Sequence, residues 1–102
     1  MRGNMFQVLV ILDVRNVEAL RRFETAAMQV VADYSGRLVT AFESGSRSES
    51  SDSCEIHLLQ FPAEEDFNAY RGDPRLDALS ELREEAIRST KLYPSRQFRN
   101  YQ

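Results

Sequence analysis

Apolar residues recur along the chain at two different spacings, and the spacings divide it into strands and helices. In residues 5–14 every even position is apolar, and alternate residues of a strand point to opposite faces of a sheet. Residues 54–61 are apolar at both odd and even positions. Both stretches predict β-strands, and the second strand needs a cover on each of its faces.

Elsewhere the apolar residues lie three and four positions apart, which is the spacing of an amphipathic helix. The first helix is predicted to begin after Asn16, a suitable N-cap, and to end before Gly36, because Gly is favoured just past a C-cap. A second helical segment breaks at Gly72. Asp73 followed by Pro74 predicts that the helix restarts there, with an N-cap side chain and a proline in the first turn.

Two further strands are predicted at residues 37–43 and 90–98, and residues 44–53, which lack large apolar side chains, form the connecting hairpin loop. The resulting β-α-β-β-α-β order is the split βαβ pattern of ferredoxin-like α+β folds. Connection rules then give an antiparallel sheet with the strand order 4-1-3-2, in which Pro94 lies on an edge strand. At this length, residues 1–102 are expected to form a single domain.

Both helical segments of this fold cover the same face of the sheet, so the other face is left open. We expect the even positions of residues 5–14 to face the helices, together with Ile56 and Leu58. The open face would then expose an apolar patch of the kind that marks an interface, formed by Leu9, Ile11, Leu59 and Phe61. The prediction is a homodimer with its sheets face to face, as in a dimeric α/β barrel, burying on the order of 1,500 Å² or more.

Composition restricts the classes of function. Apolar residues make up 42% and charged residues 28% of the chain, and no apolar run is long enough to cross a membrane. The net charge is −3 without a basic stripe, so no nucleic-acid partner is expected. One Cys excludes an internal disulfide and fits a reducing compartment, so the expected location is cytoplasmic.

His57 is the first candidate for chemistry, because it is the only His of the chain and imidazole exchanges protons near neutral pH. It is predicted to lie on the open face with Glu55, near Gln7 and Asp13. Asp13 and His57 are therefore the candidate catalytic residues. The alternative is a hydrogen-bonded His at the dimer interface, with Asp13 bonded to nearby backbone groups.

Three other residues are candidates for substrate binding, namely Tyr70, Tyr93 and Arg96. Two of them have a structural alternative, since Tyr70 has the spacing of a core residue and Arg96 suits a surface ion pair. No metal or cofactor is predicted. Cys54 and His57 are three apart on a strand and point to opposite faces, a second His is lacking, and the four Gly residues form no phosphate-binding loop.

The stretch from Glu55 to Pro62, the acidic-aromatic helix ending at Tyr70, and Asp73-Pro-Arg-Leu with Leu79 and Arg83 resemble the dimeric α/β-barrel superfamily. The resemblance is to its uncharacterised members of unknown function, which are similar to antibiotic-biosynthesis monooxygenases. It implies a dimer with a pocket, and activities that include cofactor-independent oxygenation, haem degradation, isomerisation and decarboxylation. The haem-degrading branch uses a Trp, which this chain lacks.

The leading hypothesis is a homodimeric barrel that binds a hydrophobic or aromatic small molecule, as a cofactor-independent monooxygenase or isomerase. The first alternative is a non-catalytic ligand-binding or accessory domain, and the second is a regulatory domain that uses the strand edge at residues 37–43. A cavity of about 300 Å³ or more lined by His57 and Asp13 would favour the first hypothesis. A fully packed sheet interface would favour the non-catalytic domain.

Overall fold

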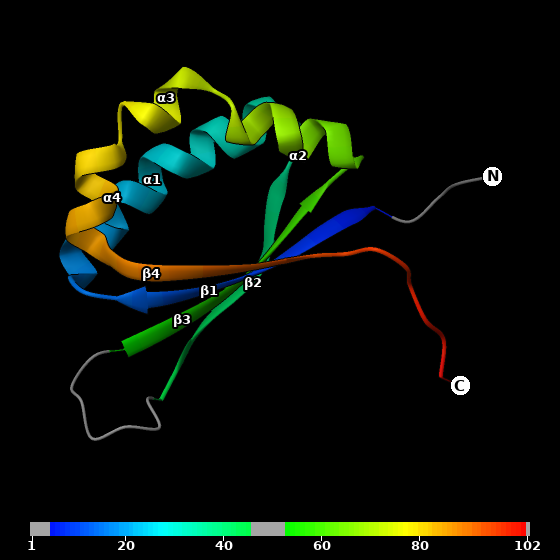
Figure 1. The fold of residues 1–102 in the computed structure, drawn as a ribbon, viewed down its shortest axis with the longest axis horizontal. Helices are drawn as coiled ribbons and strands as arrows, with labels where there is room; N and C mark the ends of the chain where they lie inside the picture. The colour runs from blue at the N-terminus through cyan, green and yellow to red at the C-terminus, as the bar shows by residue number, and fades with distance from the viewer. Residues whose placement is uncertain (1–4, 46–52, 102) are drawn as a thin grey trace.

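The computed structural model describes residues 5–45 and 53–101. Its elements are β1 (Phe6–Val14), α1 (Val17–Asp33), β2 (Arg37–Ser44), β3 (Ser53–Phe61), α2 (Glu64–Arg71), α3 (Pro74–Asp77), α4 (Ser80–Ala86) and β4 (Ile87–Pro94). The strands form one antiparallel sheet in the order β2-β3-β1-β4, which is the predicted order read from the other edge. All the helices lie over one face of this sheet (Figure 1). The ferredoxin-like α+β prediction is confirmed.

Strand register decides which side chains face the helices. Val8, Val10, Leu12 and Val14 of β1 are buried on this face, as predicted. Val10 pairs directly with His57 of β3, and paired residues of neighbouring strands project from the same face. The face assignment of β3 was therefore predicted wrongly, because the buried side chains are its odd set: Glu55, His57, Leu59 and Phe61.

The open face carries an apolar patch, as predicted, but only two of the four predicted residues belong to it. Leu9 and Ile11 lie on it, and their partners across the β1–β3 ladder are Leu58 and Ile56. Leu59 and Phe61, which were expected there, are 6% and 0% exposed under the helices. A one-residue error in the phase of a strand exchanges its two faces completely. Phe42 and Tyr93 extend this patch on the edge strands, each 54% exposed.

The ends of α1 follow the sequence, but with a different role for the glycine. Asn16 is the N-cap, as predicted, and its Oδ1 accepts a hydrogen bond from the backbone N–H of Ala19 at 3.0 Å. At the other end the left-handed residue is Ser35, with φ of 61°. Gly36 is needed for a close approach instead, since a Cβ there would lie 2.5 Å from the Phe61 ring.

The second helical segment breaks after Arg71 and restarts behind Asp73, as predicted. Asp73 caps α3 by accepting a hydrogen bond from the backbone N–H of Arg75 at 2.8 Å. A further break separates α3 from α4, and β4 begins at Ile87, three residues before the predicted start. Pro94 is the last residue of edge strand β4, where the lack of an N–H is tolerated.

Most of the predicted hairpin loop lies outside the described residues. Within those residues, no helix has the length and apolarity needed to span a membrane.

Candidate functional site

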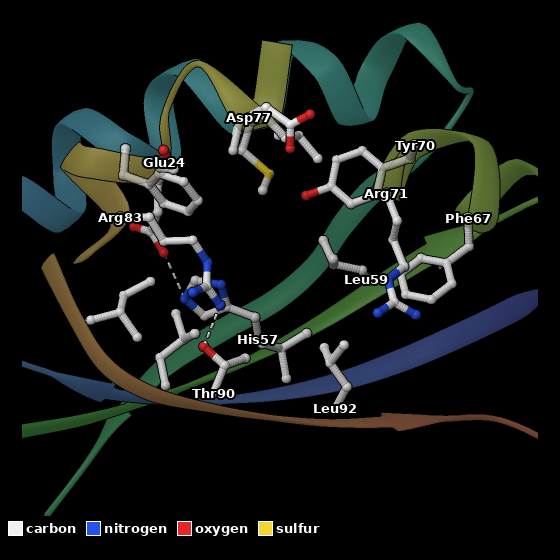
Figure 2. Close-up of a pocket in the computed structure, with 18 residues that line it drawn as sticks. Glu24, His57, Leu59, Phe67, Tyr70, Arg71, Asp77, Arg83, Thr90 and Leu92 are labelled. Atoms are coloured by element: carbon white, nitrogen blue, oxygen red, sulfur yellow. Dashed lines mark hydrogen bonds and ion pairs between the residues drawn. The ribbon is translucent and has the colours of Figure 1, made fainter. Parts of the chain in front are cut away.

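A cavity of about 360 Å³ lies between the sheet and the helices (Figure 2). Its floor is formed by apolar side chains of the sheet, and aromatic and aliphatic side chains of α1, α2 and α3 form much of its walls. Polar atoms form the smaller part of its surface. The polar and charged residues among those lining it are Glu24, His57, Tyr70, Arg71, Asp77, Ser80, Arg83 and Thr90. Such a lining suits a small, mainly apolar molecule that is oriented by a few polar groups.

His57 lines this cavity from β3 and is held by two carboxylates. Its Nε2 lies 3.0 Å from Oε1 of Glu55 in a hydrogen bond and 2.8 Å from Oε2 of Glu24 in a close ion pair. A single Nε2–H cannot point at both oxygens, and Oε2 of Glu24 is a buried atom without a hydrogen-bond partner in the described part of the chain. No hydrogen bond to Nδ1 of His57 is found within the described residues, and the side chain lines the cavity.

The two carboxylates raise the pKa of His57 above its usual 6.5. Burial alone would lower the pKa of the imidazole, but its short contacts with Glu24 and Glu55 and its attraction to their charges outweigh the loss of solvation. For Glu55 burial acts in the opposite direction and raises the pKa, because it disfavours the charged carboxylate. The contacts with His57 and Arg21 outweigh this effect and hold the pKa of Glu55 below its usual 4.5. The arrangement therefore favours an imidazolium beside an ionised Glu55.

Arg21 completes this group from the solvent side of α1. Its Nη1 lies 2.9 Å from Oε2 of Glu55 and 3.2 Å from Oε1 of Glu24. Glu24, Glu55 and His57 each offer a donor atom within 4.8 Å of the others, which is close enough for one metal ion. A cation there would have to displace both the His57 proton and Arg21. The residues thus form a proton-bridged cluster that is already neutralised by its own cations.

A second group of polar side chains lies on the helical side of the cavity. The hydroxyl of Tyr70 points toward the cavity interior (Figure 2). The Nη2 of Arg83 donates a hydrogen bond of 2.6 Å to Oγ1 of Thr90. Arg71 stacks over the ring of Phe67, with Cζ 5.4 Å from the ring centroid. These groups present hydrogen-bond donors to the cavity from α2 and α4.

The structure brings together only two of the five predicted site residues. His57 and Tyr70 both line the cavity. Asp13 lies on the opposite face of the sheet, 3.1 Å from Arg88 in an exposed ion pair. Tyr93 is exposed on that same face, and Arg96 lines a separate, more open hollow of about 640 Å³ near the end of β4. The prediction that His57 lies near Asp13 on the open face is therefore wrong.

Two residues that line the cavity, Glu24 and Arg83, were not among the predicted site residues. The sequence does contain a signal for Glu24, because it lies four residues after Leu20 and three before Ala27, on the buried stripe of α1. A carboxylate on an apolar stripe usually has a buried partner. For Arg83 no comparable signal exists, since it stands within the mixed charges of residues 81–88.

Strand order and helix placement define a ferredoxin-like α+β protein. Its candidate site is a cavity between the sheet and the helices that is lined in part by ionisable side chains. The family model for a domain of unknown function (DUF1330) matches residues 6–93, so the chain belongs to this family. Comparison with curated proteins finds no match.

Solved structures with similar folds extend this result. A protein of unknown function from Rhodopseudomonas palustris has a TM-score of 0.76 at 13% identity, covering 97% of this chain and 86% of that one. A NIPSNAP family protein with unknown function from Agrobacterium tumefaciens has a TM-score of 0.64 at 17% identity, covering 93% and 89%. A dimeric protein of unknown function with a ferredoxin-like fold from Bacteroides fragilis has a TM-score of 0.53 at 14% identity, covering 93% and 98%. At these identities the likeness shows the fold alone.

Proposed function

We propose that this protein binds a small, mainly apolar or aromatic molecule in the cavity and that His57 transfers a proton to or from it. The observation that carries the proposal is an ionisable imidazole, paired with two carboxylates, in the wall of a largely apolar cavity of about 360 Å³. A cavity of this size accommodates a molecule of one or two rings. Restricted access of water would strengthen polar interactions with the bound molecule.

Proton-transfer isomerisation is the reaction that fits this cluster best. In such a reaction a proton leaves a carbon beside a carbonyl group, the electron pair moves toward the oxygen, and a proton returns at another carbon. The raised pKa of His57 makes the imidazolium available as a proton donor at neutral pH. Its deprotonated form, less populated, accepts the proton that the substrate loses.

Cofactor-independent monooxygenation is the second candidate reaction. It begins with the same proton removal, after which the carbanion reacts with dioxygen. One oxygen atom enters the product and the other leaves as water, with the substrate giving up two hydrogens. The same apolar cavity supports this reaction, but a His57 that favours the imidazolium is a weaker base for its first step. Oxygen uptake during turnover distinguishes it from isomerisation.

Hydrogen exchange on a simple ketone tests the proposed chemistry. Phenylacetone in D2O should lose its C–H protons beside the carbonyl faster with protein than without, as followed by ¹H NMR. His57→Gln should slow the catalysed exchange by about 10²-fold or more. Asp13→Asn, on the opposite face of the sheet, is the matched control and should leave the rate unchanged. Binding of the ketone without catalysed exchange would support the non-catalytic alternative instead.

We also propose that a second copy of this chain covers the open face of the sheet. The apolar patch there, with Leu9, Ile11, Ile56, Leu58 and Phe42, is continuous across three neighbouring strands, and exposed apolar patches of this kind favour association. The similar Bacteroides fragilis protein is described as dimeric, which supports association into a dimer.

Sedimentation tests the dimer. The wild type should sediment as a dimer at micromolar concentration, and Leu58→Asp should sediment as a monomer because it places a charge in the patch. Thr25→Asp, exposed on α1, is the control that should stay dimeric. A monomeric wild type would contradict this assembly.

The regulatory alternative has less support. β2 is an edge strand, but its pairing with β3 shifts register between Leu38 and Thr40. Bulges of this kind twist an edge and oppose the addition of another strand. The cavity is therefore better supported as the functional site than the edge of β2.

A further inference from the structure

We propose that the molecule bound in the cavity carries one carboxylate on its apolar body, and that Arg83 and Tyr70 bind this carboxylate. The inference rests on the proposed function, because it names the class of molecule that occupies the same cavity. It adds an anion subsite on the helical side, separate from the carboxylates that hold His57.

Arg83 supplies a positive charge that the described protein does not neutralise. Two arginines line the cavity. Arg71 stacks on the ring of Phe67, and Arg83 forms no ion pair within the described residues. Its hydrogen bond to Oγ1 of Thr90 fixes the guanidinium over the sheet and uses one of five N–H donors. A guanidinium fork binds a carboxylate through two parallel hydrogen bonds.

Tyr70 supplies a neutral donor to the same cavity. Its ring packs against Phe61 and Phe67, with ring centroids 5.5 and 6.3 Å away, while its hydroxyl points into the cavity (Figure 2). Tyr70 is half-buried, and no described residue bonds this hydroxyl, so it can donate a hydrogen bond to a bound molecule. Burial raises the pKa of Tyr70, and the positive charge of Arg83 opposes the rise. The phenol therefore keeps its proton and can donate it.

The charges around the cavity favour a single negative charge on the bound molecule. With His57 protonated, the cavity wall and its adjoining cluster hold four cations and three carboxylates, and the excess of one positive charge lies on the helical side. The cations are Arg21, His57, Arg71 and Arg83, and the carboxylates are Glu24, Glu55 and Asp77. A carboxylate balances this excess, whereas a dianion would be repelled by Asp77.

A matched pair of probes tests the inference: 2-naphthylacetate and its neutral amide, 2-naphthylacetamide. The chain contains no Trp, so naphthalene fluorescence reports binding with little background from the protein. The wild type should bind the acid more tightly than the amide. Arg83→Gln should weaken binding of the acid about tenfold or more, as expected for loss of a hydrogen bond to a charged group, and leave the amide unchanged.

Further variants separate charge from packing. Arg83→Lys should retain part of the preference for the acid, and Tyr70→Phe should reduce it by a smaller factor than Arg83→Gln. Asp77→Asn should tighten binding of the acid only. Arg22→Gln, an exposed arginine on α1, is the control and should change neither affinity.

The outcomes distinguish this inference from the proposed function on which it rests. If the amide binds the wild type as tightly as the acid, or if Arg83→Gln leaves affinity for the acid unchanged, the anion subsite is wrong while the apolar binding cavity stands. If neither probe binds the wild type, both the proposed binding function and the anion subsite are contradicted.

Discussion

Replacing His57 by Gln should destabilise the fold by an amount that depends on pH. Gln keeps one hydrogen-bond donor near Glu55 but removes the positive charge between two carboxylates. His57 is 5% exposed and its Nε2 lies 3.0 Å from Oε1 of Glu55. Hydrogen bonds to charged groups contribute about 1.5–3 kcal/mol, so we expect a loss of about 2 kcal/mol in the free energy of unfolding at pH 5.5.

The sign of the pH dependence follows from the direction of the His57 shift. Because the folded pKa lies above the usual 6.5, the stabilisation is fully present below 6.5 and is lost as the pH rises through the folded value. Glu55, with its pKa held below 4.5, remains ionised at pH 5.5. The difference between wild type and His57→Gln should therefore shrink from pH 5.5 to pH 9.

Urea unfolding at several pH values measures this difference directly. At pH 5.5 the melting temperature of the variant should also fall by roughly 10 °C, given about 4–8 °C per kcal/mol for a domain of this size. Asp13→Asn removes an exposed ion pair and should change stability by less than about 1 kcal/mol. An equal loss for His57→Gln at pH 5.5 and pH 9 would refute the charged role of His57.

Two further substitutions test the packing and capping that support the site. Gly36→Ala should lower the free energy of unfolding by about 1–3 kcal/mol, because its Cβ would meet Phe61; Phe61→Leu in the same chain should reduce that penalty, and an unchanged urea midpoint for Gly36→Ala would contradict the reasoning. Asp73→Asn should destabilise the fold above pH 4, because hydrogen bonds from Arg75 and Tyr34 hold the pKa of Asp73 well below its usual 3.8. This contribution is lost as the pH falls toward the folded value, so acid titration should bring the wild type close to the variant.

Much of the fold could be predicted because local signals agreed with one another. The alternation in β1 identified the face that packs under the helices, and Asn16 and Asp73 marked helix starts by capping chemistry that depends on a few neighbouring residues. Strand order followed from connection rules and from Pro94 at an edge. Each of these signals is local or topological, so none needed knowledge of side-chain packing.

The face of β3 could not be predicted in the same way, and the site prediction failed with it. Ile56 and Leu58 are as apolar as Leu59 and Phe61, so hydrophobicity did not distinguish the two faces of β3. The register with β1 decides, and Phe61 is accommodated because Gly36 leaves room for its ring. In this register the side chains of His57 and Glu55 point toward the helices, and Glu24 of α1 contacts His57 there. Glu24 and His57 are 33 residues apart in the chain, so neither segment alone predicts their contact.

Titration of the His57 imidazole by NMR, with and without 2-naphthylacetate, tests the central claim most directly. The chain has only one His, so its ring C–H resonances are identified without assignment of the other residues. The account predicts a pKa above 6.5 in the free protein, a lower pKa in Glu24→Gln, and resonances that move when the probe binds. A pKa at or below 6.5 that neither Glu24→Gln nor the probe alters would contradict it.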